Sequence, residues 1–166
     1  MSQDQEFYFT SNRAIYWPAE FNPIVNLFKG LNELGETIPE IAPMYQYNTY
    51  PVVLAAIIGL VNNRQRDVGS QRNEIMTDTF ENHKYRGVRL AAFLFLIPLI
   101  GKQEIDLLRP ENEDLVLRTF EKYCAGGFEY LRGALSESYD DNGEAVLQSE
   151  VRRAMESWDM GLVAES

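Results

Sequence analysis

The sequence predicts a mainly α-helical fold: a compact bundle of five or six helices that forms a single domain over residues 1–166, with room for a small N-terminal β element. The chain has 166 residues, the size of one ordinary domain, and 45% of them are hydrophobic, which is enough to build a core. Apolar residues recur at the spacing of a helix face in several segments. No internal repeat, linker or low-complexity segment divides the chain, and we expect disorder only at residues 1–6 and 160–166.

The N-terminal part predicts a strand element followed by a helix. Residues 7–17 are aromatic and strand-prone, so we expect one or two short strands there. Asn22 is predicted to cap a helix, because Pro23 then takes the first helical position. Apolar residues continue at helical spacing to Leu34, and Gly35 is predicted to end this helix.

The middle of the chain predicts a loop, a buried helix and a second loop. Residues 37–48 contain two prolines and should form a loop. Thr49 is predicted to cap a helix that runs to about Asn62 and is apolar on all sides, as expected for a central helix. Residues 62–72 are polar and should form an exposed loop, whereas residues 74–80 fit either a short strand or a helical turn.

The next part predicts two longer helices. Asn82 is predicted to cap a helix that reaches about Ile97, where Pro98 should end or kink it. Pro110 is predicted to open the following helix, with acidic residues near its positive end. We expect Gly126-Gly127 to break this helix before its pattern resumes at Phe128.

The C-terminal part predicts a turn and a final helix. Residues 140–143 should form the turn, and the helix should cover residues 144–158. One side of this helix is apolar and contains Leu147, Val151, Ala154, Met155 and Trp158.

Two apolar runs, Pro51–Val61 and Leu90–Ile100, raise the question of whether the chain inserts into a membrane. Each run has about eleven residues, whereas a membrane span needs roughly 20, so we expect buried helices and no membrane insertion. Two such helices are hard to cover in a small domain, which leaves a homodimer open. The polar N-terminus lacks a signal sequence and the chain has one cysteine, so a cytoplasmic protein is predicted.

The charge distribution argues against one class of partner. The net charge is −10, of which residues 104–166 contribute −9, with six basic and fifteen acidic side chains. Residues 62–89 carry six basic and four acidic side chains, a balance of +2. Repulsion from phosphate argues against a free-standing nucleic-acid binder, although a local basic contact and a basic protein partner both remain compatible.

No linear motif assigns a catalytic residue, a cofactor or a metal site. The chain has one histidine, His83, which excludes zinc sites that need two imidazoles, and we expect it in a solvated first turn of a helix. Cys124 lies on an apolar helix face and is predicted to be a buried structural thiol. The residues before Gly143 fit a turn rather than a calcium loop, because the carboxylate that would close the loop falls one position late.

The polar stretch from residue 62 to residue 89 carries the binding prediction. It joins two buried helices, and recognition residues tend to lie in loops on rigid scaffolds. Guanidinium groups can bind phosphate or carboxylate with two hydrogen bonds, although a solvated loop explains the same residues. The candidate binding residues are Asn63, Arg64, Arg66, Arg72, Arg86 and Arg89.

Three pieces of the chain, spanning roughly residues 50–135, form a recognisable pattern. They are the helix Val52–Val61 running into Asn62-Asn63-Arg64-Gln65-Arg66, the segment 75–82 before an apolar helix, and the segment 120–131 with its Gly-Gly pair. In this order they resemble the small Dnd-system-associated, or DNA phosphorothioation-associated, accessory proteins of bacteria. The resemblance implies a cytosolic bacterial protein that accompanies sulfur modification of the DNA backbone or the associated restriction. It implies no catalytic residues and therefore points to an accessory or regulatory subunit.

The sequence leaves three functions open. The leading hypothesis is a non-enzymatic accessory or regulatory protein that contacts other proteins of a prokaryotic DNA-modification or restriction system. A small enzyme remains an alternative, because an active site around residues 62–89 need not form a linear motif. An acidic inhibitor that mimics DNA is the other alternative, and it requires the C-terminal carboxylates to lie in rows spaced like phosphates.

Overall fold

The structure, a computed structural model, describes residues 8–41, 43–137 and 144–164, and within them the protein is mainly helical as predicted. The α-helices are α1 (Asn22–Phe28), α2 (Thr49–Val61), α3 (Thr77–Asn82), α4 (Ala91–Lys102), α5 (Glu113–Ser136) and α6 (Glu144–Ala164). The strands are β1 (Ala14–Pro18), β2 (Arg72–Met76), β3 (Lys84–Tyr85) and β4 (Val88–Arg89). Three short 3-10 helices are η1 (Ala19–Phe21), η2 (Ile105–Leu108) and η3 (Pro110–Asn112).

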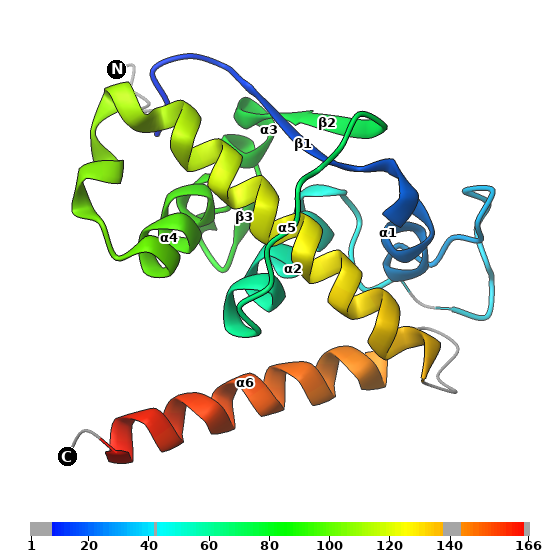
Figure 1. Cartoon of the computed structure of the whole chain (residues 1–166). Helices are drawn as coiled ribbons and strands as arrows, with labels where there is room; N and C mark the ends of the chain where they lie inside the picture. Colours follow the sequence, from blue (N-terminus) through cyan, green and yellow to red (C-terminus); the bar gives the residue numbers. More distant parts are fainter. Residues whose placement is uncertain (1–7, 42, 138–143, 165–166) are drawn as a thin grey trace.

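Helix α5 is the central element of the fold. It crosses the molecule diagonally in Figure 1 and contacts α2, α4 and strand β1. Strands β1 and β2 pair antiparallel, with Ile15 opposite Ile75, although almost sixty residues separate them in the sequence. Helix α6 extends beyond the rest of the molecule and continues to Ala164, further than the predicted end at residue 158.

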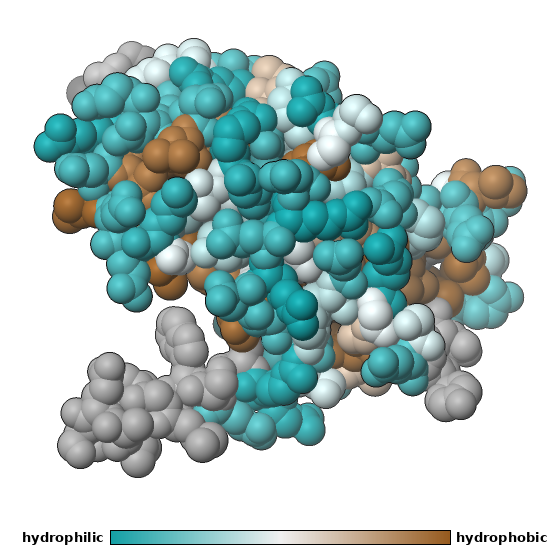
Figure 2. Space-filling model, in the orientation of Figure 1, coloured by the Kyte–Doolittle hydropathy of each residue, from teal (hydrophilic) through white to brown (hydrophobic). Residues whose placement is uncertain are grey.

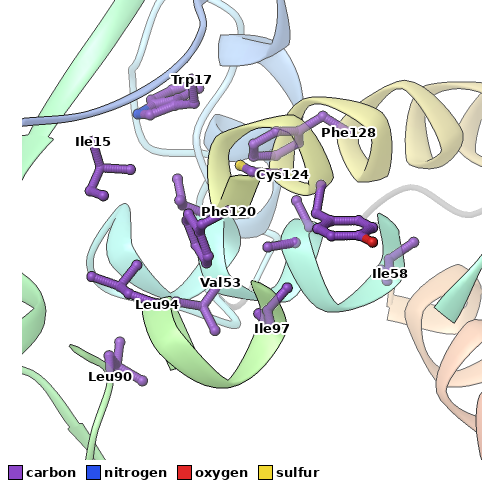
Figure 3. Close-up of a cluster of buried hydrophobic side chains, with 14 of the residues drawn as sticks. Ile15, Trp17, Val53, Ile58, Leu90, Leu94, Ile97, Phe120, Cys124 and Phe128 are labelled. Atoms are coloured by element: carbon purple, nitrogen blue, oxygen red, sulfur yellow. The ribbon is translucent and has the colours of Figure 1, made fainter. Parts of the chain in front are cut away.

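The core forms around one stripe of α5. Phe120, Cys124 and Phe128 follow one another at four-residue spacing and are fully buried, as a single helix face requires. Figure 3 shows these side chains meeting residues from α2, α4 and β1. Strand β1 contributes Ile15 and Trp17, so the strand-prone N-terminal segment is part of the core.

The closest packing in the fold is a contact between helix backbones, which we call the α2–α5 seam and define by Gly59, Gly126 and Gly127. A Cβ atom on Gly127 would overlap the carbonyl oxygen of Ala55, and one on Gly59 would overlap that of Tyr123. Only glycine permits such an approach. The predicted break at Gly126-Gly127 is therefore wrong: α5 runs through both glycines, which serve packing instead.

The first helix is shorter than predicted. Helix α1 ends at Phe28, and Gly30 turns the chain with a φ of 70°, so Leu34 lies outside the helix and is 84% exposed. Asn22 does not cap the helix, because η1 has already brought the chain into a helical turn and Asn22 itself has helical angles. Residues 37–48 form a loop as predicted, apart from residue 42, which lies outside the described residues, and an isolated bridge between Leu31 and Thr37.

Two predicted caps are also wrong. Thr49 is the first residue of α2 and makes no capping hydrogen bond, because its hydroxyl faces His83 instead. Asn82 ends α3 rather than starting the next helix. The β3–β4 hairpin separates the two helices, since Arg86 and Gly87 both adopt positive φ in its turn. Residues 74–80 satisfy both alternatives left open by the sequence, because β2 ends at Met76 and α3 begins at Thr77.

Helix α4 differs from its predicted form in length and burial. Pro98 lies inside α4, which continues to Lys102, so the proline does not end the helix. Burial is one-sided: Leu94 and Ile97 are buried, whereas Leu96 and Ile100 are 44% and 48% exposed. No described helix is both long and apolar enough to cross a membrane.

The remaining predictions concern the C-terminal half. Pro110 opens η3, which leads into α5 as expected. The turn at residues 140–143 lies outside the described residues, and so do residues 1–6, 165 and 166. On the predicted apolar side of α6, the side chains that the structure describes differ: Leu147 is buried, whereas Val151 and Met155 are 48% and 65% exposed.

Candidate functional site

The six predicted binding residues lie in three separate places. Asn63 and Arg64 form the turn after α2, Arg66 and Arg72 lie against β1 and η1, and Arg86 and Arg89 belong to the β3–β4 hairpin. None of the described cavities is lined by more than one of these six residues.

The loop after α2 is fixed by the α2–α5 seam. The Arg64 amide donates to the Gly59 carbonyl at 2.7 Å, and the Arg66 amide donates to the Lys122 carbonyl at 3.0 Å. A Cβ atom on Gly126 would overlap the Arg64 carbonyl, so this glycine lets the loop lie directly on α5. The polar loop is thus positioned by a rigid scaffold, as its place in the sequence led us to expect.

Arg64 lies at the edge of a groove of about 410 Å³ between α5 and α6. Arg153 enters this groove from α6 and pairs with Glu150 at 2.7 Å, and Tyr130 donates a hydrogen bond to the same carboxylate at 3.3 Å. Burial raises the pKa of Glu150. Because cations and carboxylates both line the groove, its charge favours neither anions nor cations.

Arg66 is engaged within the fold rather than directed at solvent. It forms an ion pair with Glu20, which also pairs with Arg132 at 2.8 Å. Both guanidinium groups lie over the Phe21 ring, at 5.3 and 4.8 Å from its centroid. The hydrogen bonds from Arg132 and Arg66 lower the pKa of Glu20. In the same way, Arg72 lies 3.8 Å over the ring of Tyr16.

Three buried glutamates bind the N-terminal segment at successive points, an arrangement that the sequence did not reveal, and we call them the glutamate clamp. Glu81, Glu113 and Glu121 are only 3–4% exposed. They accept backbone hydrogen bonds from the N-terminal segment: from Tyr8 at 2.6 Å, from Thr10 at 2.9 Å and from Tyr16 at 2.8 Å, respectively.

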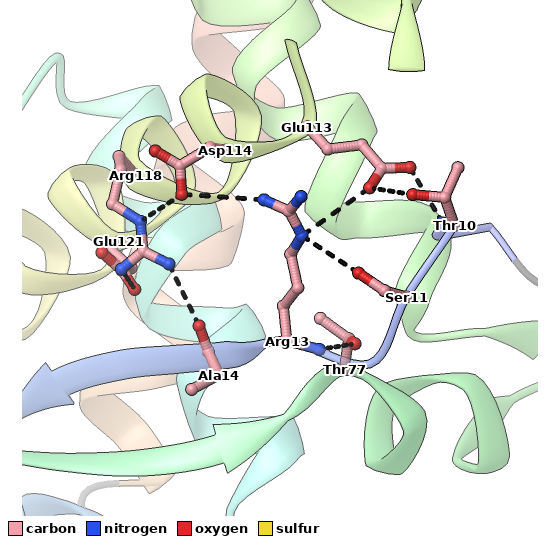
Figure 4. Close-up of polar contacts among 9 residues, drawn as sticks. All are labelled: Thr10, Ser11, Arg13, Ala14, Thr77, Glu113, Asp114, Arg118 and Glu121. Atoms are coloured by element: carbon pink, nitrogen blue, oxygen red, sulfur yellow. Dashed lines mark hydrogen bonds and ion pairs between the residues drawn. The ribbon is translucent and has the colours of Figure 1, made fainter. Parts of the chain in front are cut away.

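Each glutamate of the clamp also has an arginine partner. Arg89 lies 3.5 Å from Glu81, Arg13 lies 3.8 Å from Glu113, and Arg118 lies 2.6 Å from Glu121. Figure 4 shows Arg13 reaching between Glu113 and Asp114 while Thr10 meets the other side of Glu113. The pKa of Glu121 is raised by burial, although the Tyr16 amide and the Arg118 charge act in the opposite direction. Glu113 and Glu121 are therefore buried partners of the N-terminal segment rather than solvated surface carboxylates.

One sequence signal could have identified part of the clamp. Leu117, Cys124 and Phe128 lie on one helical stripe of α5, and Glu121 occupies the position in that stripe between Leu117 and Cys124. A carboxylate on an apolar stripe must be paired when it is buried. Its partner, the Tyr16 amide, lies 105 residues away in the sequence, so no local pattern could have named it.

His83 is not the solvated first-turn residue that we predicted. It follows the last residue of α3, its Nδ1 lies 2.7 Å from the Thr49 hydroxyl, and its ring stacks on Tyr47 with 4.4 Å between centroids. Burial lowers the pKa of the His83 ring, which favours its neutral form. The sequence could not show that Tyr47 and Thr49 would meet this histidine.

Cys124 confirms the prediction of a buried thiol. Its side chain is fully buried in the core, and burial raises its pKa well above the usual value. A thiol in that environment stays protonated and inert. Within the residues that the structure describes, no group of three or more histidine, cysteine, aspartate or glutamate side chains could hold a metal ion.

Taken together, these features define a mainly helical protein with polar surface sites and, in the part that the structure describes, no set of reactive groups converging on one cavity. The sequence profile of the DNA sulphur modification system-associated protein 4 family matches residues 31–161, and the chain belongs to this family. The resemblance seen over residues 50–135 is thereby confirmed and extended. Comparison with curated proteins gave no match, and neither did comparison with solved structures.

The fold explains why two of the resembling pieces occur together. The segment 62–66 and the segment 120–131 lie far apart in the sequence, but they meet at the α2–α5 seam, where the Arg66 amide binds the Lys122 carbonyl. These two pieces therefore form one structural unit.

Proposed function

We propose that this protein is a non-enzymatic accessory or regulatory component of a prokaryotic DNA sulphur modification system, and that it acts in the cytoplasm through contacts with other proteins of that system. Membership of the DNA sulphur modification system-associated protein 4 family is the observation that carries this proposal.

The distribution of reactive side chains supports a role without catalysis. A small enzyme built from the basic loop would need its arginines and His83 around one cavity. Instead, Arg66 pairs with Glu20, Arg72 stacks on Tyr16, and His83 lies in an aromatic cluster with Tyr47.

The exposed side of α6 supports a role in protein–protein contact. Val151 and Met155 lie on it, and together with Met44 and Tyr45 they line an open groove of about 630 Å³. Methionine side chains adapt well to the surface of a partner. Figure 2 shows a face that is mainly polar with separate hydrophobic patches. An exposed groove with mostly apolar lining is a candidate contact surface on such a protein.

The partner that fits this groove is a protein segment with an apolar face and basic side chains beside it. Residues 104–166 carry a net charge of −9, which favours such a partner and disfavours a second copy of this acidic chain. A homodimer is the competing occupant, and light scattering distinguishes the two because a monomer has a mass of 19.1 kDa.

The test is co-expression with the proteins of the sulphur modification system, followed by capture of the tagged protein. We expect stoichiometric recovery of at least one of them, and loss of that recovery in the double variant Val151→Asp, Met155→Asp. The matched control is Glu156→Gln, an exposed α6 position outside the groove lining. Recovery of none of these proteins at matched expression levels would overturn the proposal.

A further inference from the structure

A row of nearly parallel aromatic rings forms one edge of the molecule. Tyr45 and Tyr50 are 6° from parallel with 5.9 Å between centroids, and Tyr50 and His83 are 13° from parallel at 6.0 Å. Tyr47 stacks on His83 at 4.4 Å and ends the row, and its side chain is 46% exposed. The row therefore ends in a ring that a further planar group can reach.

The row is held rigidly in place. The Thr49 hydroxyl lies 2.7 Å from Nδ1 of His83, and the Tyr50 hydroxyl donates to the Lys84 carbonyl at 2.8 Å. The Leu90 amide donates to the His83 carbonyl, also at 2.8 Å. These bonds connect the row to the β3–β4 hairpin, so the two form one surface.

The hairpin adds cations and another exposed ring to this surface. Lys84 and Arg86 are exposed, Tyr85 is 55% exposed, and the Arg86 guanidinium lies 5.6 Å from the centroid of the Tyr85 ring. Lys84 lies directly opposite Arg89 across the hairpin. Like charges in that arrangement repel each other, and Glu81 forms an ion pair with Arg89 at 3.5 Å.

The segments that build this surface contain no carboxylate. In an otherwise acidic chain, residues 41–66 and 82–103 lack aspartate and glutamate altogether, while residues 82–103 contain four basic side chains. Among the neighbouring elements, α3 contributes the exposed Asp78 and the buried Glu81, and α6 contributes the exposed Glu144, which lines a groove together with Tyr45. The β3–β4 hairpin therefore carries only basic charges, although the whole protein is negative.

We propose that the surface formed by Tyr47, Tyr85, Lys84 and Arg86 binds a single strand of nucleic acid. Exposed aromatic rings beside cations suit unpaired bases and phosphates, since bases of any kind stack on such rings and phosphates pair with lysine and arginine. An acidic protein segment would use the cations but would leave Tyr47 and Tyr85 without a role. This inference is independent of the protein–protein role proposed above.

The test measures fluorescence anisotropy of a labelled, mixed-sequence single-stranded DNA 15-mer titrated with the purified full chain at several salt concentrations. We expect binding at low salt that weakens as salt rises, with a logarithmic slope of about −1.5 for two phosphate contacts. Duplex DNA of the same sequence should bind less tightly, because its bases are not available for stacking.

Variants assign the binding to this surface. Lys84→Gln with Arg86→Gln should weaken binding about tenfold and reduce the magnitude of the salt slope. Tyr85→Ala should weaken binding about fivefold or more and leave the slope unchanged. The control Lys102→Gln with Arg109→Gln removes the same charge from exposed positions beyond the hairpin and should stay within about twofold.

Three outcomes would overturn the proposal: no binding at the lowest salt concentration, equal losses in the control and the hairpin variants, or tighter binding of a polyglutamate peptide than of the DNA. Circular dichroism and the unfolding midpoint establish that each variant is folded. Since this assay uses the pure protein, its failure leaves the co-expression result unaffected.

Discussion

The α2–α5 seam and the N-terminal segment of residues 8–18 both pack against α5, but different forces hold them there. The seam depends on shape, because glycine removes the Cβ atoms that would separate two backbones. The N-terminal segment depends on charge and hydrogen bonding, because buried carboxylates accept its amides. Steric changes should therefore damage the first region, and changes of charge or pH should damage the second.

The largest effect is expected from Gly127→Val in the seam. The new side chain would overlap the Ala55 carbonyl, and backbone is hard to displace, so we expect a loss of about 3 kcal/mol or more in the free energy of unfolding. Gly133→Ala is the matched control on the same helix, where a Cβ atom meets nothing within 4 Å. It should be neutral or stabilise by up to about 1 kcal/mol. Urea denaturation measures the stability of both variants. Equal losses would contradict the claim that the seam depends on the absence of a Cβ atom at Gly127.

The next largest effect is expected from Glu121→Ala in the glutamate clamp. It leaves the Tyr16 amide and the Arg118 guanidinium without their acceptor, and we expect a loss of about 2 kcal/mol in the free energy of unfolding. The loss is smaller than for a fully buried ion pair because Arg118 is partly exposed and water can solvate it. Glu121→Gln keeps a carbonyl oxygen and should lose about half as much. Glu129→Gln removes a largely exposed carboxylate and should change stability by less than about 0.5 kcal/mol. Equal losses in all three variants would show that burial of the carboxylate is irrelevant.

The pH dependence of stability should have opposite signs at two glutamates. The pKa of Glu20 is lowered by Arg132 and Arg66, so its contribution is present above the unfolded value of 4.5 and is lost as the pH falls through the folded pKa. The pKa of Glu121 is raised by burial, so its contribution is complete below 4.5 and is lost as the pH rises through the folded pKa.

Stability curves of Glu20→Gln and Glu121→Gln between about pH 3.5 and pH 7 measure this difference. Relative to the unmodified protein, Glu20→Gln should become less stable as the pH rises, whereas Glu121→Gln should become more stable. Parallel curves for the two variants would contradict the assigned causes.

The smallest effect on folding is expected on α6. Val151 is 48% exposed, so Val151→Asp should change the free energy of unfolding by less than about 0.5 kcal/mol, whereas Leu147→Ala, at a buried position, should cost about 2 kcal/mol. Thermal denaturation of both variants checks this contrast. A large loss in Val151→Asp would mean that the outer face of α6 is packed within the protein.

The sequence predicted the elements that depend on local periodicity. The apolar helix 49–62 and the stripe of Phe120, Cys124 and Phe128 were visible because a helix repeats its face along the chain. The errors at Asn22, Thr49 and Asn82 have a shared cause: a residue suited to capping takes that role only if its own backbone is non-helical, and all three residues lie within a helix. Neighbouring structure decided that backbone in each case.

The sites were predicted less completely than the fold. The sequence placed Arg64 in an exposed loop on a scaffold, whereas it placed Arg86 in a helix starting at Asn82 instead of in the β3–β4 turn. It could not show that Arg66 would pair with Glu20, 46 residues away, or that Tyr47 would stack on His83. Such pairs depend on tertiary contacts, and a single sequence contains no record of them.

Strand β1 has a practical consequence for work on this family. The family profile begins at residue 31, yet Ile15, Trp17 and Phe21 are buried in the core, and β2 has β1 as its partner. A gene fragment trimmed to residues 31–161 would encode a chain with an open hydrophobic cavity and an unpaired strand edge, the combination that drives insolubility. Expression of that fragment would then yield aggregates, and the cause would be the missing strand β1 rather than low stability of the full-length fold.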